Sequence, residues 1–96
     1  MQTQQQLKAI LRDLKPLLAS RFHVRRLWYF GSFATGQPGP ESDVDILAEF
    51  TEPLGRDFFE LEKLLKNALH RKIDLVTPDA LKRQLRESIM AQVRYI

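Results

Sequence analysis

The chain has 96 residues, of which 44% are hydrophobic and 28% are charged, and it contains no cysteine. This composition is typical of one small globular domain, and it excludes disulfides, thiolate zinc sites and cysteine nucleophiles. The net charge is +3, and no apolar run approaches the roughly 20 residues needed to span a bilayer. We therefore expect a single domain over residues 1–96 that has no membrane segment and works in the cytoplasm.

The charges are distributed unevenly along the chain. Residues 1–30 contain six basic residues and one acidic residue. Residues 31–80 contain five basic and ten acidic residues, and residues 81–96 contain four basic residues and one acidic residue. An acidic centre between basic ends suits a cation site better than a nucleic-acid groove. In a chain this short, chance clustering of surface charges would give the same distribution.

Helical and strand patterns alternate in the first half of the chain. Leucines and isoleucine at helical spacing predict a helix over most of residues 4–20, and Pro16 inside it should kink or split that helix. The aromatic run 27–30 predicts a short buried strand that ends at Gly31. Residues 36–41 are dense in glycine and proline, which predicts a loop.

The same alternation continues in the second half. Residues 43–50 predict a second strand, and apolar residues at helical spacing predict a helix over 56–70. Residues 73–76 predict a third strand, and Thr77 followed by Pro78 predicts the start of a last helix. The fold class expected is therefore α/β, a small mixed β-sheet with the site on one side and helices packed on the other face.

The C-terminal stretch is rich in apolar side chains. Residues 93–96 could form the last helical turn or a short extended tail. An apolar patch that a core this small does not fully bury marks an interface. We therefore expect these residues to contact a protein partner: Ile89, Met90, Val93, Tyr95 and Ile96.

Gly31 and Ser32 follow the first predicted strand directly. Gly31 allows the backbone to approach a ligand closely. If Ser32 opens a helical turn, its hydroxyl and the local N–H groups form a cradle for phosphate. Without further evidence, a glycine-serine pair is more often a plain turn at the end of a strand.

Three aspartates lie on the next two predicted strands. Asp43 and Asp45 are two residues apart, so their side chains point the same way. Carboxylates this close repel unless a cation or protons relieve the charge, and hard oxygen ligands suit Mg²⁺. Asp74 lies between apolar residues, where an acid is either functional or on the exposed face of an edge strand. Together with the glycine-serine turn, these aspartates describe a two-metal phosphoryl-transfer site.

Two stretches of the chain carry a family signature: GSFATG over residues 31–36 and SDVDI over residues 42–46. They resemble the signature of DNA polymerase β-type nucleotidyltransferases, and most closely that of the minimal (MNT) branch. That branch also has a strand such as residues 73–76 followed by a Thr-Pro helix start, so the resemblance spans about residues 5–90. It implies a nucleotidyltransferase (polymerase β-like) fold.

The resemblance also implies a role for each site residue. Gly31 and Ser32 would bind the triphosphate, and Asp43 and Asp45 would ligate two Mg²⁺ ions. Asp74 would ligate the metal nearer the nucleophile and help to deprotonate the attacking hydroxyl. Many relatives have arginine where this chain has Thr35. If that arginine holds phosphate, either the affinity for phosphate is lower here or a base from another segment substitutes for it. Three candidates that the sequence does not rank are Arg56, Arg71 and Lys72.

Members of the MNT branch are often antitoxins of HEPN-domain ribonuclease toxins, and some attach AMP to a tyrosine hydroxyl of the toxin. The resemblance therefore implies Mg²⁺-dependent transfer of AMP from ATP to a HEPN-type partner held in a hetero-oligomer. The alternative is an antitoxin that neutralises its toxin by binding only. Direct nucleic-acid binding is not expected, because the sequence contains no recognised DNA-binding pattern.

Overall fold

The fold, seen in a computed structural model that describes residues 4–31, 43–80 and 83–96, is a four-stranded sheet with three α-helices and a short 3₁₀ turn. The elements are α1 (Gln4–Phe22), β1 (Val24–Phe30), β2 (Val44–Phe50), α3 (Asp57–Leu69), β3 (Ile73–Val76), the 3₁₀ turn η1 (Pro78–Ala80), α4 (Arg83–Gln92) and β4 (Arg94–Tyr95). Within these residues, no helix is both long and apolar enough to cross a membrane.

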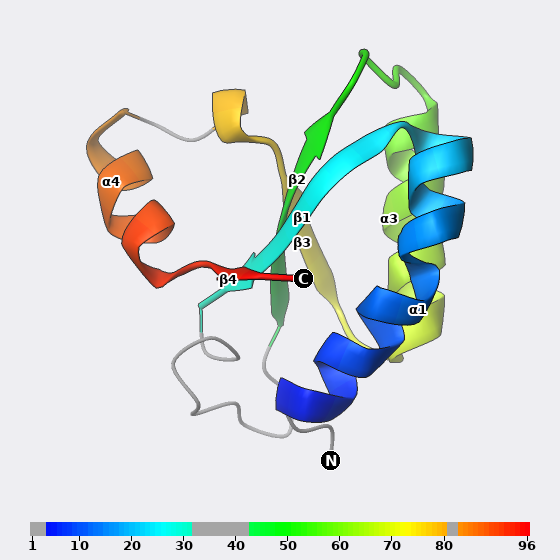
Figure 1. Cartoon of the computed structure of the whole chain (residues 1–96). Coiled ribbons are helices and arrows are strands. Elements are labelled where there is room, and N and C mark those ends of the chain that lie inside the picture. Colours follow the sequence, from blue (N-terminus) through cyan, green and yellow to red (C-terminus); the bar gives the residue numbers. More distant parts are fainter. Residues whose placement is uncertain (1–3, 32–42, 81–82) are drawn as a thin grey trace.

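The mixed sheet predicted from the sequence is confirmed. Its strand order is β3-β2-β1-β4, with β2 parallel to β3 and antiparallel to β1, and with β4 antiparallel to β1. Helices α1 and α3 cover one face of the sheet, while α4 stands on the other side (Figure 1). The expected packing of helices on one face therefore holds for α1 and α3 but not for α4.

One core fills the space between the sheet and the helices α1 and α3. Alternate residues of each strand point into it, because successive side chains on a strand face opposite sides. The helices contribute residues spaced three or four apart, which form a single apolar stripe on each helix. The buried members are Leu7, Leu11, Leu18, Phe22, Leu27, Tyr29, Val44, Ile46, Ala48, Leu61, Leu65, Leu69, Leu75 and Ile96.

Pro16 does not split the first helix. Helix α1 is continuous from Gln4 to Phe22, with Pro16 inside it. Proline removes one main-chain N–H from the helix, so the carbonyl four residues earlier loses its usual partner. Because Pro16 is exposed, water can bind that carbonyl, and the helix tolerates the proline.

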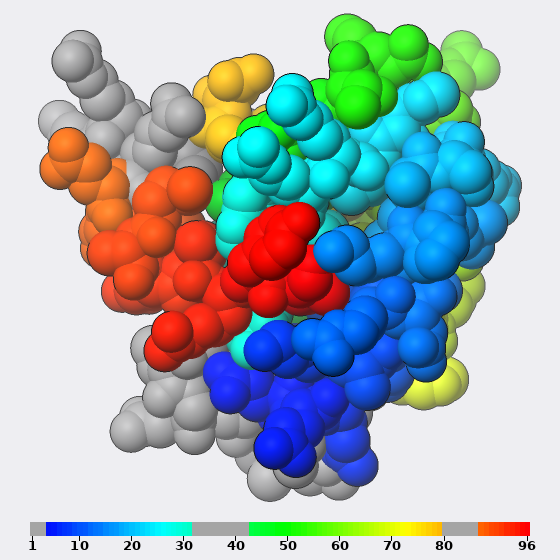
Figure 2. Space-filling view, in the orientation of Figure 1, coloured from blue at the N-terminus to red at the C-terminus, as the bar shows by residue number. Residues whose placement is uncertain are grey.

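The C-terminal residues belong to the sheet and the core. Arg94 and Tyr95 pair with β1, and the Ile96 N–H donates to the carbonyl of Leu27 at 3.0 Å. Ile96 is only 4% exposed, and the Lys15 ammonium donates to its main-chain oxygen. Figure 2 shows this red segment seated against β1 in cyan and α1 in blue.

The expectation that all five apolar C-terminal residues are free for a partner is therefore wrong for Ile96, which the chain's own core buries. Tyr95 and Met90 remain 56% and 39% exposed. The extended tail, one of the two conformations left open by the sequence, is the one observed.

Replacing Ile96 with alanine should test this core role. We expect Ile96→Ala to lower the free energy of unfolding by about 2–4 kcal/mol, because it removes a buried branched side chain and leaves a cavity. Urea unfolding measures the change. Met90→Ala is the control and should cost less than about 0.5 kcal/mol, since the methionine is substantially exposed. Equal stability of the two variants would show that Ile96 does not anchor the fold.

Candidate active site

The sheet brings Asp45 and Asp74 together. In β2, Asp45 is paired with Phe30 of β1 on one side and with Asp74 of β3 on the other. Paired residues on neighbouring strands lie about 5 Å apart, although these two aspartates are far apart in sequence. Asp43 precedes β2 directly and is exposed. The three predicted aspartates therefore lie at the same end of the sheet.

These carboxylates lie on the face of the sheet opposite α1 and α3. Val44 and Ile46, the neighbours of Asp45 along β2, are buried in the core that those helices cover. Alternation along the strand then places Asp45 on the other face, as it does Asp74 next to buried Leu75. The three carboxylates and the packed helices α1 and α3 therefore lie on opposite faces of the sheet, as predicted, whereas α4 stands on the side of the carboxylates.

The aspartates form one electrostatic unit. Burial, together with the negative charges of Asp74 and Asp43, raises the pKa of the Asp45 carboxyl to about 6. A carboxylate in this position is costly without a counter-charge, and three carboxylates offer the hard oxygen donors that Mg²⁺ prefers. The donor chemistry thus fits a divalent cation.

The coordination geometry of a metal site is not formed in the part of the chain that the structure describes. There, no group of three or more histidine, cysteine, aspartate or glutamate side chains is arranged to hold a metal ion. The aspartates fit a cation by their chemistry and by the charge they share. Their role as metal ligands therefore stays a proposal.

Gly31 has a structural role that the sequence did not reveal. Its φ is +73°, a left-handed conformation that other residues adopt only with strain. A Cβ atom at this position would lie 2.1 Å from the Oδ2 atom of Asp45. Gly31 thus makes room for the Asp45 carboxylate. Sequence reasoning had assigned it only to the ligand, because the contact depends on the register of β1 against β2.

Two residues singled out in the sequence lie outside the described residues, within the range 32–42. They are Ser32, the other predicted phosphate ligand, and Thr35, which stands where many relatives have arginine. The prediction that Ser32 binds phosphate stays a prediction.

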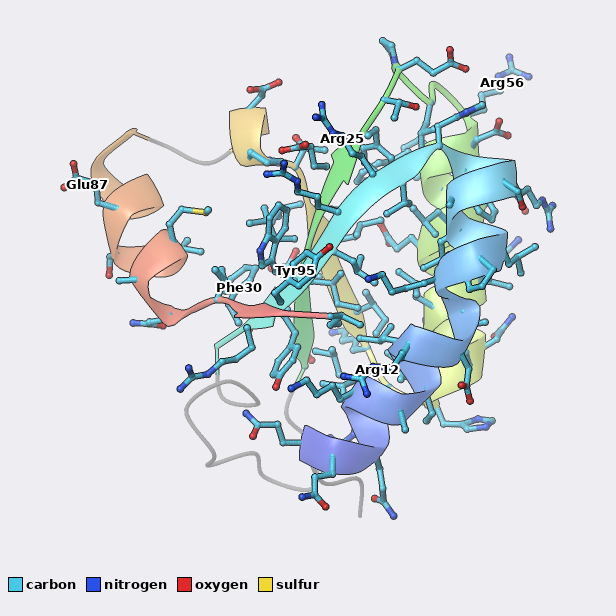
Figure 3. The ribbon with its side chains drawn as sticks, in the orientation of Figure 1. Arg12, Arg25, Phe30, Arg56, Glu87 and Tyr95 are labelled. Atoms are coloured by element: carbon cyan, nitrogen blue, oxygen red, sulfur yellow. The ribbon has the colours of Figure 1, made fainter. Side chains whose placement is uncertain are left out.

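The structure distinguishes between two of the three basic residues that could replace the arginine that relatives have at position 35. Arg56 lies at the start of α3, after the far end of β2, and points outward at the top of the molecule (Figure 3). The carbonyl of Lys72, in contrast, accepts a hydrogen bond of 2.9 Å from the N–H of Val44, next to Asp43. By position, Lys72 is the better candidate for a positive charge near the aspartates. Arg71 is its neighbour in sequence.

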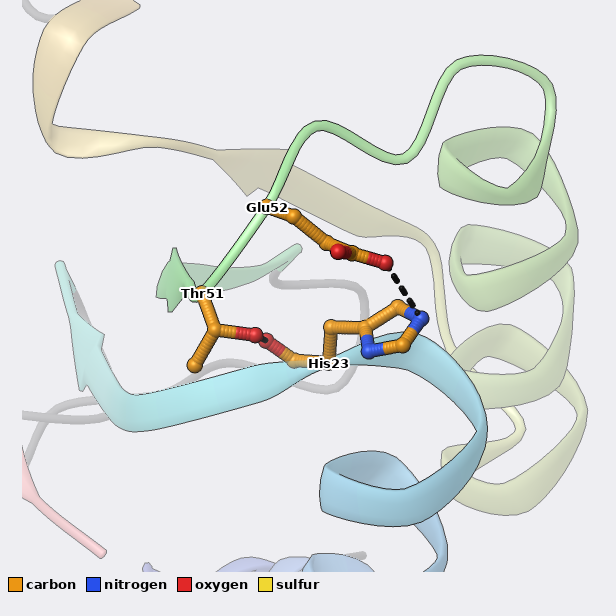
Figure 4. A network of polar contacts seen from close by, with 3 residues as sticks. All are labelled: His23, Thr51 and Glu52. Atoms are coloured by element: carbon orange, nitrogen blue, oxygen red, sulfur yellow. Dashed lines mark hydrogen bonds and ion pairs between the residues drawn. The ribbon is translucent and has the colours of Figure 1, made fainter.

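The two histidines do not belong to the site. His23 and His70 both have a positive φ, of 56° and 54°, and each lies where a helix ends. His23 forms an ion pair of 3.0 Å with Glu52 beyond the far end of β2 (Figure 4). His70 terminates α3, as predicted from its position in the sequence.

Comparison with known proteins identifies the family. Residues 6–96 match the family described as the nucleotidyltransferase domain. The chain belongs to the nucleotidyltransferase family. This nucleotidyltransferase is also 37% identical to the protein adenylyltransferase MntA of Thermococcus cleftensis over 97 residues, which cover 100% of this chain and 98% of MntA. The enzyme class predicted from the aspartates and the glycine-serine turn is confirmed.

Solved structures confirm the fold. A minimal nucleotidyltransferase superimposes with a TM-score of 0.85 at 28% sequence identity, covering 99% of this chain and 97% of that one. A chain of the complex between a tri-AMPylated HEPN toxin and its MNT antitoxin, from Shewanella oneidensis, superimposes with a TM-score of 0.60 at 22% identity. That match covers 96% of this nucleotidyltransferase and 66% of the other chain, and it shows a shared fold.

The raised pKa of Asp45 predicts how stability depends on pH in the absence of metal. The unfolded chain releases this proton near pH 3.8 and the folded chain only near pH 6, so stability should fall as the pH rises through this range. Asp45→Asn should remove this loss. At pH 7.5 in EDTA the variant should be more stable by about 1 kcal/mol, a value that allows for solvent screening of a partly exposed group.

Urea unfolding of both proteins at pH 4.0, 5.5 and 7.5 measures this difference, which should be smallest at pH 4.0. Asp13→Asn on the exposed side of α1 is the matched control and should show no such pH dependence. A less stable Asp45→Asn variant at pH 7.5 would show that the Asp45 carboxylate stabilises the fold.

A methyl group at Gly31 should displace the Asp45 carboxylate. We expect Gly31→Ala to cost about 1–2 kcal/mol of stability from its positive φ and to abolish most nucleotide transfer, because the new Cβ collides with Oδ2 of Asp45. Gly55→Ala is the control for the stability cost of a positive φ, since Gly55 has a φ of +58° but no atom within 4 Å of a Cβ there. If Gly31→Ala transfers nucleotide as well as wild type does, the contact with Asp45 has no functional importance.

Proposed function

We propose that this nucleotidyltransferase transfers AMP from ATP to a tyrosine hydroxyl of a HEPN-type partner protein and thereby acts as its antitoxin. The observation that carries the proposal is the pairing of Asp45 with Asp74 beside Gly31, on the face opposite α1 and α3. The 37% identity to a protein adenylyltransferase supports adenylyl transfer to protein. The shared fold with the complex of an MNT antitoxin and a tri-AMPylated HEPN toxin supports the acceptor. Both proteins would work in the cytoplasm.

The proposed reaction assigns a role to each site residue. Asp43, Asp45 and Asp74 would hold Mg²⁺, in a site for two ions. When bound, the metal would neutralise the triphosphate and polarise the α-phosphate. Gly31 and Ser32 would bind the triphosphate oxygens, with Lys72 as a nearby positive charge.

The bond changes follow from in-line displacement. The acceptor oxygen forms a bond to the α-phosphorus, the bond from the α-phosphorus to the bridging oxygen breaks, and pyrophosphate leaves. Asp74, on the exposed edge strand β3, would accept the proton of the acceptor hydroxyl. The chain's contribution is therefore mainly positioning and charge neutralisation.

Intact-mass spectrometry of the partner tests this proposal directly. The HEPN-domain partner is incubated with Mg²⁺ and each of the four nucleoside triphosphates in turn, with wild type or with the variant Asp43→Asn/Asp45→Asn. We expect a mass gain equal to one or more AMP groups with wild type and ATP only. Asp13→Asn, the same chemical change on α1, should transfer as wild type does.

Binding-only neutralisation predicts a different result. In that case the partner's mass stays constant, yet wild type and Asp43→Asn/Asp45→Asn inhibit its ribonuclease activity equally. A transfer that survives the double substitution would instead show that these aspartates do not hold the catalytic metal.

A further inference from the structure

A concave site lies at the end of the sheet away from the aspartates. A pocket of about 580 Å³ is lined by the last residues of β2, the loop that leads into α3, and the start of η1. From Asp45 to Phe50, which lines the pocket, β2 extends about 16 Å. In Figure 1 the end of β1 and the start of β2 lie in the lower half, whereas the loop after β2 lies at the top. The pocket is therefore separate from the candidate active site.

Aromatic rings connect the interior of this pocket to the surface. The rings of Phe50 and Phe58, which both line it, meet edge to face with centroids 6.4 Å apart. Phe58 in turn contacts Phe59 at 6.0 Å. Phe59 lies outside the pocket lining and is 69% exposed, so its ring gains little from folding and adds apolar surface beside Phe58. Leu54 and Pro78 add further apolar lining.

The rim of the pocket is acidic. Glu49, Glu52 and Asp79 line it, and its described lining includes no lysine, arginine or histidine. Asp57 and Glu60, in the first turn of α3, add two more carboxylates next to the phenylalanines. In a chain whose net charge is +3, this local negative charge favours a cationic group.

Two of the rim carboxylates each lie near a basic side chain outside the pocket lining. The imidazole of His23 lies 3.0 Å from Glu52, and the guanidinium of Arg25 lies 3.6 Å from Glu49 (Figure 4 shows the first pair). The Thr51 hydroxyl donates to the carbonyl of His23, which ties the same loop to the start of β1. A carboxylate has acceptor positions for more than one donor, so each of these glutamates can still bind a second cation.

We propose that this pocket docks the acceptor protein, through a segment that presents an arginine or lysine between apolar side chains. The apolar side chains would pack against Phe58 and Phe59, and the cation would meet the acidic rim. A domain this small needs a second contact to orient an acceptor whose hydroxyl must reach the aspartates. The inference rests on the proposed function for the existence of that acceptor.

Binding and transfer measured separately test the docking site. In the Asp43→Asn/Asp45→Asn background, where transfer is absent, Phe59→Ala and Asp79→Lys should each weaken binding to the purified HEPN-domain partner by about tenfold or more. In the active background they should raise KM for the partner and leave kcat at saturation unchanged. Leu17→Ala on α1 and Glu87→Lys on α4, comparable changes at exposed positions outside the pocket lining, should have little effect on either. Thermal melting confirms that each variant folds.

The outcomes separate the two proposals. If the pocket variants bind the partner as wild type does, the docking site is wrong even though transfer occurs. If wild type binds through the pocket but transfers no AMP, the proposed reaction is wrong and the docking site stands. If wild type does not bind the partner at all, both fail.

A small organic cation is the competing occupant. L-arginine amide, titrated into the chain alone, should bind only weakly, because it lacks the apolar neighbours of a protein segment. Micromolar binding of this probe, lost in Asp79→Lys while partner binding is unchanged, would assign the pocket to a small ligand and overturn the docking proposal.

Discussion

The register of β2 between β1 and β3 is the constraint on which the site depends. It pairs Asp45 with Phe30 on one side and with Asp74 on the other, and it places the carboxylate where only a glycine at position 31 leaves room. A shift of one residue would turn Asp45 toward the helices and bring Val44 out of the core. Because Val44, Ile46 and the apolar face of β1 are buried, the core itself prevents that shift. The core thus determines the position of the Asp45 carboxylate.

This arrangement places an unfavourable charge in a small domain. Burial and two like charges raise the pKa of Asp45, so the folded chain is less stable at neutral pH than it would be with a neutral residue. The apolar stripes of α1 and α3 on the opposite face offset this loss, and β4 adds Ile96 to the same core. A cation that binds the folded form would recover stability at the site itself. The charges on one face of the sheet therefore lower the stability of the fold, and the core on the other face raises it.

Much of the fold could be predicted from periodicity, because leucines at helical spacing and short runs of apolar residues are local features. The third strand was predicted with its observed limits, and α3 within one residue at each end. The role of Pro16 and the burial of Ile96 could not be predicted, since both depend on which side of an element faces the rest of the chain. The grouping of Asp43, Asp45 and Asp74 was predicted, but the contact of Gly31 with Asp45 requires the register of the sheet. The aromatic and acidic pocket was missed for the same reason, as its lining comes from three separated segments.

The two ends of β2 differ in their surroundings: carboxylates and a glycine lie at one end, and an aromatic and acidic pocket lies at the other. This difference suggests how a small enzyme could orient a large substrate. At one end, a nearby strand and a glycine leave little freedom to the Asp45 carboxylate, as the chemistry of phosphoryl transfer requires. At the other end, the exposed ring of Phe59 and the carboxylates of Glu49 and Glu52 form an apolar and acidic surface. A rigid strand fixes the distance between them. An acceptor that contacts both ends would therefore have its hydroxyl oriented by the sheet itself.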